Sequence, residues 1–280
     1  MIRLAVLTLA LASPAMAEDR WTVVPDAATM PVAASSGMAE VNGISMYYAT
    51  YGVASGAHDP VLLIHGGLGH ADLWAGQVAD LMTDRLVIVA DSRGHGRSTR
   101  NADAYGYDLM ASDYLVLLDS LGIAKVDLVG WSDGGIIGLD IAMTHPERLD
   151  HLFAHAANIT TDGVNPGVGT DAVFGAYITK MGVDYAAMSP TPDQFDAFVG
   201  QISEMWATQP NWTDAQVAAI TAPTAIVVGD HDEAILPDHT AKIAGLIPGA
   251  KAVILPGLSH FAMLQAPGEY TAAIRAFIDG

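Results

Sequence analysis

The sequence contains no cysteine, few basic residues and, after position 17, no long apolar run. Without cysteine there are no disulfide bonds, so a hydrophobic core must supply the stability. Only 12 Lys and Arg stand against 31 Asp and Glu, and the net charge of −19 leaves no basic surface for nucleic acid. Since a membrane-spanning helix needs about 20 apolar residues, no segment beyond the N-terminus is expected to insert stably into a bilayer.

Residues 1–17 have the features of a secretory signal peptide. Arg3 precedes an apolar run too short to span a bilayer, and Ala15-Met16-Ala17 supplies the small residues expected before a cleavage site. We therefore predict cleavage after Ala17 and an exported protein, periplasmic or secreted; a hydrophobic strand or a membrane anchor is the alternative. Residues 18–37, rich in Pro, Ala and Ser, are predicted to form a flexible lead-in.

The rest of the chain, with 51% hydrophobic and 15% charged residues overall, can bury a sizeable core as one large domain. Strand-like and helix-like segments alternate over 38–157 and again over 219–280. Because continuous apolar strands between helices are typical of a parallel sheet covered on both faces, we predict an α/β fold with a mostly parallel, doubly wound sheet. Residues 158–218 interrupt the alternation and are predicted to form a helical cap.

The Asn42-Gly43 pair predicts a hairpin turn within 38–52. Buried strands are expected within 60–67, 85–96, 125–131, 149–157, 224–232 and 251–261, and helices over 71–82, 107–122, 133–145, 238–247 and 267–279.

The stretch Gly130-Trp131-Ser132-Asp133-Gly134 is a G-x-S-x-G motif between a predicted strand and a predicted helix. A sharp turn at such a place holds the serine in a strained conformation, and the glycines let the chain pass close to itself. Ser132 is therefore a candidate nucleophile; the alternative is a serine that happens to lie in a turn.

A serine hydroxyl needs a base to take its proton and an acid to orient that base. His260 follows the last predicted strand, and Asp232 ends the strand before it. Both lie at carboxyl ends of strands, on the same sheet edge as Ser132. The order Ser132, Asp232, His260 is that of the nucleophile, acid and histidine associated with this turn.

Five short motifs together resemble the α/β-hydrolase fold superfamily over residues 38–280: HGG (65–67), DSRGHGRS (91–98), GWSDGG (130–135), GDHD (229–232) and SHF (259–261). The chain is most similar to the esterase-like branch with a helical cap, near bacterial ester hydrolases and valacyclovir-hydrolase-like enzymes.

The motif geometry and the resemblance together imply an oxyanion hole. One donor is the amide of Asp133, which directly follows the nucleophile. The resemblance places the second donor at Gly67, with Leu68 as a possible substitute. It implies a serine hydrolase that cleaves small-molecule carboxylic esters through an acyl-enzyme, without cofactor or metal. Lactonase, aminoacyl-ester hydrolase, cofactor-free perhydrolase and carbon–carbon bond hydrolase are the alternatives within the fold.

Several residues have more than one interpretation. Asp230 and Asp162 compete with Asp232 for the role of the acid. Asp133 either stabilises the first turn of its helix or faces the pocket, where it would favour substrates carrying an ammonium group.

Other polar residues near the motifs are predicted to be structural. His65 is expected to be a loop histidine without a catalytic role. Asp91, Arg93 and Arg97 are expected to hold their own loop through hydrogen bonds.

Three unrelated functions fit the sequence less well. A dinucleotide-binding site at 67–72 would place Asp72 where a glycine is needed. His65, His70 and Asp72 lack a standard metal-ligand spacing. A non-enzymatic binding protein would not need a nucleophile, base, acid and oxyanion loop together. Acyl length, the alcohol and the oligomeric state are left open by the sequence.

Overall fold

The computed structural model describes residues 19–54 and 56–280. In these residues the chain forms one eight-stranded sheet in the order β1-β2-β4-β3-β5-β6-β7-β8. The hairpin strands β1 and β2 are antiparallel to each other, and β2 also pairs antiparallel with β4. Strands β3 to β8 all run parallel to one another. The predicted mostly parallel α/β fold is confirmed.

The strands are β1 (Ser35–Val41), β2 (Ile44–Tyr51), β3 (Val61–Ile64), β4 (Val87–Ala90), β5 (Val126–Trp131), β6 (Leu149–His155), β7 (Thr224–Gly229) and β8 (Lys251–Leu255). The α-helices are α1 (Ala75–Leu81), α2 (Tyr107–Ser120), α3 (Asp133–Thr144), α4 (Ala172–Met188), α5 (Phe195–Thr208), α6 (Asp214–Val217), α7 (Pro237–Leu246), α8 (Ala262–Gln265) and α9 (Pro267–Ile278). Short 3₁₀ turns include η1 (Arg20–Thr22), η2 (Ala71–Trp74) and η4 (Thr161–Gly163).

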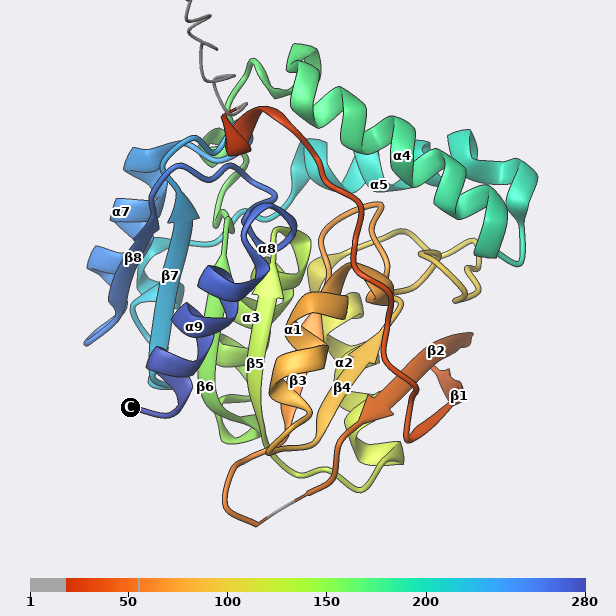
Figure 1. Ribbon diagram of the computed structural model, residues 1–280. Coiled ribbons are helices and arrows are strands. Elements are labelled where there is room, and N and C mark those ends of the chain that lie inside the picture. The colour runs from red at the N-terminus through yellow and green to blue at the C-terminus, as the bar shows by residue number, and fades with distance from the viewer. Residues whose placement is uncertain (1–18, 55) are drawn as a thin grey trace, which may run out of the picture.

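Helices cover both faces of the sheet (Figure 1). Helices α1 and α9 pack against each other on one face, and α2 and α3 pack on the other, where α3 contacts β5 and β6. Strands β3, β4, β5 and β7 are buried at every position, which explains their continuous apolar sequences. This two-sided burial fixes the sheet edge at which the candidate residues meet.

Residues 158–218 contain helices α4, α5 and α6 and no strand. Helix α4 crosses above the carboxyl ends of the strands (Figure 1). It is fastened to the loop after β3, because the Tyr177 hydroxyl donates to the carbonyl oxygen of Gly67 at 2.8 Å. Three buried side chains pack these helices against each other and against the core: Tyr177 and Met181 of α4 and Phe198 of α5.

The N-terminal part of the described chain differs from the sequence prediction. Strand β1 begins at Ser35, three residues before the predicted start, because Ser35 to Gly37 pair with Tyr48 to Thr50. Among the preceding residues, Arg20 forms a 2.6 Å ion pair with Glu269. The predicted signal peptide, residues 1–17, lies outside the described residues.

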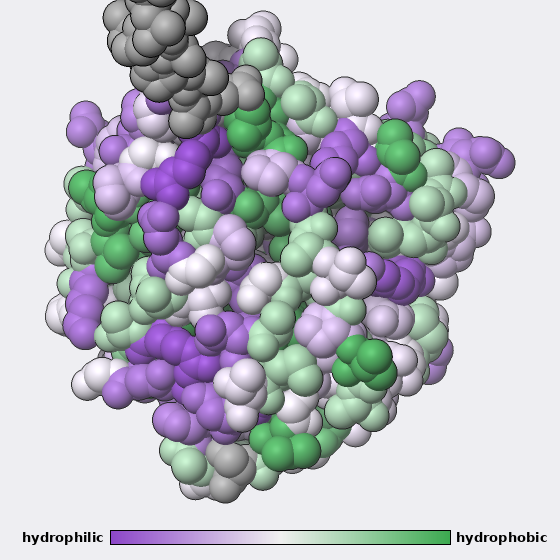
Figure 2. Space-filling model, in the orientation of Figure 1, coloured by the Kyte–Doolittle hydropathy of each residue, from purple (hydrophilic) through white to green (hydrophobic). Residues whose placement is uncertain are grey.

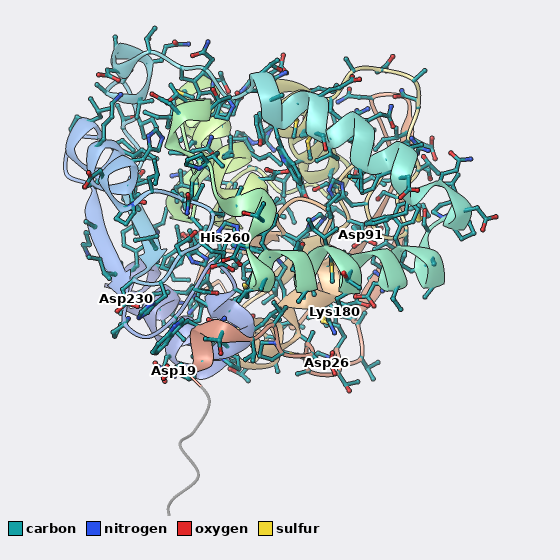
Figure 3. All side chains as sticks on the ribbon, turned by 90° about the horizontal axis from the view of Figure 1, so that it is seen from above. Asp19, Asp26, Asp91, Lys180, Asp230 and His260 are labelled. Atoms are coloured by element: carbon teal, nitrogen blue, oxygen red, sulfur yellow. The ribbon has the colours of Figure 1, made fainter. Side chains whose placement is uncertain are left out.

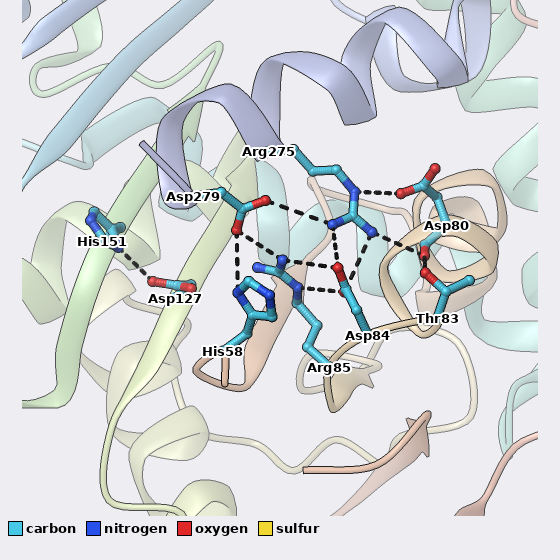
Figure 4. A network of polar contacts seen from close by, with 9 residues as sticks. All are labelled: His58, Asp80, Thr83, Asp84, Arg85, Asp127, His151, Arg275 and Asp279. Carbon is cyan, nitrogen blue, oxygen red and sulfur yellow. Dashed lines mark hydrogen bonds and ion pairs between the residues drawn. The ribbon is translucent and has the colours of Figure 1, made fainter. Parts of the chain in front are cut away.

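A charged network lies beside α9, far from the carboxyl edge of the sheet (Figure 4). Arg275 contacts Asp80 at 2.6 Å and Asp84 at 2.8 Å, and buried Arg85 contacts Asp279 at 2.8 Å. A hydrophilic area covers this part of the surface in Figure 2. The network joins the last helix to the end of α1, so its role is structural.

None of the helices in residues 19–54 and 56–280 has both the length and the apolar character that crossing a membrane requires.

Candidate active site

Ser132 occupies the sharp turn between β5 and α3, with φ of 54° and ψ of −119°. A residue with a Cβ rarely adopts this region, and such strain collects at functional sites. Two hydrogen bonds hold the turn: the Ser132 amide donates to the His155 carbonyl at 2.8 Å, and its carbonyl accepts from Ile136 at 3.0 Å. The backbone strain therefore presents the serine side chain outside both elements.

The two flanking glycines are required because the backbone of the turn passes very close to its neighbours. A Cβ on Gly130 would lie 2.1 Å from the carbonyl oxygen of Gly134. A Cβ on Gly134 would lie 2.1 Å from the carbonyl oxygen of Ile64 on β3. Since real Cβ atoms do not approach backbone oxygens so closely, only glycine fits either position.

Asp232 and His260 contact each other, each on the loop that follows its strand. The Nδ1 atom of His260 lies 3.1 Å from both carboxylate oxygens of Asp232. Both side chains are buried: that of His260 is 2% exposed and that of Asp232 is 0% exposed. Backbone amides of Ala234 and Ile235 also donate to Oδ1 of Asp232, at 2.9 and 2.8 Å. The carboxylate is thus oriented from two sides.

Opposite charge outweighs burial at this pair. Burial is the largest single effect on the pKa of His260 and lowers it, but Asp232, Glu233 and Asp133 together raise it by more, so the net shift is upward from 6.5. Burial is likewise the largest effect on the pKa of Asp232 and raises it, but His260, the Ile235 amide and His155 together lower it by more, so the net shift is downward. The pair favours an ionised acid beside an imidazole that readily accepts a proton.

The two competing acids lie elsewhere. Asp230 turns away, and its Oδ1 accepts from the Gly257 amide at 2.7 Å. Asp162 lies in η4, where its carboxylate accepts from the Thr160 hydroxyl. Within the described residues, neither has a recorded hydrogen bond to His260, so Asp232 is the acid that contacts the histidine.

Ser132 and His260 line one pocket of about 710 Å³ between the sheet edge and the cap. No hydrogen bond is recorded between their side chains in the described residues; such bonds are often long before substrate binds. The lining is mainly apolar, with Val164, Phe174 and Ile178 among its residues. The described lining residues include Asp133 and Asp162 but neither Lys nor Arg.

Asp133 faces the pocket and is held by two aromatic donors. The Tyr107 hydroxyl donates to Oδ1 at 2.8 Å, and the Trp206 indole lies 3.0 Å from both oxygens. Burial raises the pKa of Asp133, although both donors oppose this shift. Asp133 therefore combines both interpretations drawn from the sequence: it opens α3 and it also lines the pocket.

The predicted oxyanion donors lie at the start of α3 and in the loop after β3. The Asp133 amide is the first of α3 and has no partner within the helix. Among the described residues no acceptor is recorded for the amides of Gly67 and Leu68. A Cβ on Gly67 would lie 2.3 Å from the Trp206 ring, and Leu68 has a positive φ of 62°. Both amides therefore stay available as second donor.

His65 has a structural environment. Its Nε2 accepts from the Ser92 amide at 3.0 Å, its Nδ1 contacts the Gly66 carbonyl at 2.7 Å, and burial lowers its pKa to about 3.

The predicted loop contacts of Asp91 and Arg97 are present, since Asp91 Oδ2 accepts from the Arg97 amide at 2.7 Å. Arg93 also holds its loop: its Nη1 donates to Asn101 Oδ1 at 3.5 Å, and it forms a buried bidentate ion pair, 2.7 Å on each arm, with Asp113 of α2. Arg93 therefore attaches the loop to the helix layer.

The sequence analysis missed several site residues. Tyr107 and Trp206 are distant in sequence from Asp133, and no pattern connects them. Glu233 directly follows the acid, and its carboxylate accepts from the His260 amide at 3.0 Å. Its place next to Asp232 at a strand end was the one available signal. In the described residues no group of three or more His, Asp or Glu is arranged to hold a metal ion.

The alpha/beta hydrolase fold family model matches residues 59–205. The chain is 25% identical over 263 residues to a protein provisionally named carbamate hydrolase RutD from Caulobacter sp. (strain K31), covering 84% of this chain and 96% of the relative. It is 26% identical over 254 residues to the 2-hydroxymuconate semialdehyde hydrolase of Pseudomonas sp. (strain CF600), covering 80% and 88%. The crystal structure of the enol-lactonase from Burkholderia xenovorans LB400 matches with a TM-score of 0.71 at 23% identity, covering 87% of this chain and 100% of that one.

The family match spans more than half of the chain, and the fold agrees with it. The protein therefore belongs to the α/β-hydrolase fold family, which confirms the resemblance noted from the five motifs, and it is a hydrolase.

Proposed function

We propose that this protein is a serine hydrolase that cleaves carboxylic esters, with Ser132 as nucleophile, His260 as base and Asp232 as acid. One observation carries the proposal: a strained, glycine-flanked Ser132 lines the same pocket as a histidine that is hydrogen-bonded to a buried aspartate. A turn kept only for packing would require none of these three features together.

In the first half of the reaction, His260 Nε2 takes the hydroxyl proton of Ser132 while Oγ attacks the ester carbonyl carbon. The carbonyl oxygen becomes an oxyanion, which accepts hydrogen bonds from the amides of Asp133 and Gly67. One such donor contributes about 3 kcal/mol to the transition state. The carbonyl re-forms, the C–O bond to the alcohol breaks, and His260 returns its proton to the leaving oxygen, which leaves an acyl-enzyme.

In the second half, a water molecule gives a proton to His260 and attacks the acyl carbon. The resulting tetrahedral intermediate uses the same oxyanion donors. It collapses with loss of the Ser132 oxygen, which regains the proton from His260, and the carboxylic acid departs. Asp232 stabilises the imidazolium in both halves and keeps its Nδ1 protonated. The reaction requires no cofactor or metal.

The pocket charge favours neutral or cationic substrates. Asp133 and Asp162 line it without Lys or Arg, so an anionic substrate would meet repulsion there. Asp133 lines the pocket and directly follows Ser132 in the chain, and an acidic residue at this place supports aminoacyl esters as the second candidate. The carbon–carbon bond hydrolase alternative is less well supported. The 2-hydroxymuconate semialdehyde that gives one relative its name carries a carboxylate, which the acidic lining would repel.

A short-chain p-nitrophenyl ester assay tests the proposal. We expect turnover by the unaltered protein, none above background by Ser132→Ala, and covalent labelling of Ser132 by a fluorophosphonate with chelators present. Labelling elsewhere, or undiminished turnover by Ser132→Ala, would overturn the assignment. A panel of acyl esters, lactones, carbamates and amino-acid esters then identifies the substrate class.

We further propose that the protein acts after export, on a small-molecule ester and without nucleic acid or stable membrane insertion. The N-terminal leader supports export, and the net charge of −19 argues against nucleic acid. Mass spectrometry of the protein from the periplasm and medium should show a chain that starts at residue 18. A full-length cytoplasmic chain would contradict this proposal.

A further inference from the structure

The described chain begins with a segment that runs over the loops of the candidate active site. We call residues 20–26 the strap. From η1 it passes beside α8 and across the molecule toward β1 (Figure 1). The view from above shows Asp19 at one end and Asp26 beside Lys180 of α4 at the other (Figure 3). The strap therefore extends from two loops to the cap. We call residues 230–236, which carry Asp232, the acid loop, and residues 256–261, which carry His260, the histidine loop.

The strap contacts the acid loop through a ring stack. The Trp21 ring lies flat on His231, with centroids 3.9 Å apart and planes 4° apart. His231 directly precedes Asp232. Trp21 therefore holds down the residue next to the carboxylate that orients His260.

The strap contacts the histidine loop through Gln265 of α8. The Gln265 Nε2 donates to the Val23 carbonyl at 2.9 Å and to the Ser259 hydroxyl at 2.9 Å, while its Oε1 accepts from the Ser259 amide at 2.8 Å. Ser259 directly precedes His260 and is fully buried. One glutamine side chain thus joins the strap to the residue that directly precedes the histidine.

Three further contacts anchor the strap, two from Arg20 and one from Asp26. Arg20 donates to Glu269 at 2.6 Å and to the Pro256 carbonyl at 3.4 Å. Asp26 forms an ion pair with Lys180, but Asp26 is 89% exposed, and exposed pairs contribute little. The contacts that hold the strap are therefore mainly at its Arg20 end, next to the two loops, and not at its Asp26 end, next to the cap.

We propose that the strap is a positioning element that keeps the Asp232 and His260 loops in register. The positioning residues are Trp21 of the strap and Gln265 of α8, which binds the strap. The inference rests on the proposed function, because register matters only if His260 is the base for Ser132. None of the strap residues is among the described residues that line the pocket, so the strap acts on the site through the loops that it contacts.

The test compares four variants with the unaltered full chain: Trp21→Ala, Trp21→Phe, Gln265→Met and Thr22→Ala. Thr22 is the matched control, because it lies in the same turn and its side chain donates only to the Asp19 carbonyl. Two rates are measured: phosphonylation of Ser132 by a fluorophosphonate, and kcat and KM for a p-nitrophenyl ester. Circular dichroism sets a temperature at which each variant is folded.

We expect Trp21→Ala and Gln265→Met to lower kcat and the phosphonylation rate by about tenfold with KM nearly unchanged, since a misplaced catalytic group costs up to about 10²-fold. Trp21→Phe should recover most of the loss, and Thr22→Ala should match the unaltered protein. Unchanged rates in both positioning variants, or an equal loss in Thr22→Ala, would overturn the inference. If Trp21→Ala does not fold, Gln265→Met decides. If the unaltered protein is not phosphonylated at Ser132, the proposed function fails instead.

Discussion

Replacing Asp232 by asparagine tests the hydrogen-bond direction at the base. Two backbone amides donate to Oδ1, at 2.9 and 2.8 Å, so an asparagine must place its carbonyl oxygen there. Its NH₂ group then takes the place of Oδ2, 3.1 Å from Nδ1 of His260. The carbonyl oxygen is also 3.1 Å from Nδ1, but it already accepts from the two backbone amides. Two donors would therefore face each other at the Oδ2 position, which favours loss of the Nδ1 proton. The ring proton would move to Nε2, where His260 is no longer a base for Ser132.

The magnitude follows from this tautomer change. In serine-protease triads the same substitution lowers kcat by about 10⁴, which is about 5.4 kcal/mol at 1.36 kcal/mol per decade. We expect Asp232→Asn to lose about 10³ to 10⁴ in kcat with a KM within about threefold, because the geometry is retained. Steady-state hydrolysis of a p-nitrophenyl ester, with circular dichroism to verify folding, measures both constants.

Two matched substitutions control this experiment. Asp230→Asn keeps an oxygen for the Gly257 amide and should retain activity within about threefold of the unaltered protein, as is usual for a change away from the reacting groups. Asp162→Asn alters the pocket charge and should affect KM more than kcat. The reasoning is refuted if Asp232→Asn stays within tenfold of the unaltered protein, or if Asp162→Asn shows the larger loss in kcat.

Three further predictions concern the site. The acid limb of kcat/KM should lie above pH 6.5, because His260 must be neutral and, although burial lowers its pKa, Asp232, Glu233 and Asp133 together raise it by more. Glu233→Gln should move this limb to lower pH, since the Glu233 charge contributes to the upward shift, and an unmoved limb in a full pH profile would count against it. Gly134→Ala should destabilise the fold by more than about 3 kcal/mol, because its Cβ would meet the Ile64 carbonyl, and urea denaturation close to that of the unaltered protein would contradict the geometry. In a double-mutant cycle, Tyr107→Phe should lower the free energy of unfolding by about 2 kcal/mol when Asp133 is present, and by about 1 kcal/mol less in the Asp133→Asn background. Equal losses in the two backgrounds would show that the hydrogen bond from Tyr107 to Asp133 does not stabilise the fold.

Short-range patterns explain why the fold was predictable. Apolar runs such as 125–131 mark buried strands, and strands buried on both sides must lie in a parallel sheet between helices. The fold class is confirmed on this basis. Element ends were less accurate: the predicted helix over 71–82 begins as the 3₁₀ turn η2, and β1 begins at Ser35, because pairing with β2 determines where the strand starts.

The candidate site was predictable where it follows from chain direction. Ser132, Asp232 and His260 all follow parallel strands, and parallel strands carry their carboxyl ends to one edge. The sequence alone thus determined the sheet, the order of the three residues and the need for glycine on both sides of the serine.

The tertiary structure decided which distant side chains surround those residues. Tyr107 and Trp206 reach Asp133 from α2 and the cap, and Trp21 reaches His231 from the opposite end of the chain. No local periodicity encodes such contacts, because they depend on how the cap and the strap pack against the core. The same packing sets the size of the pocket and its lack of positive charge, and with them the substrates that can enter.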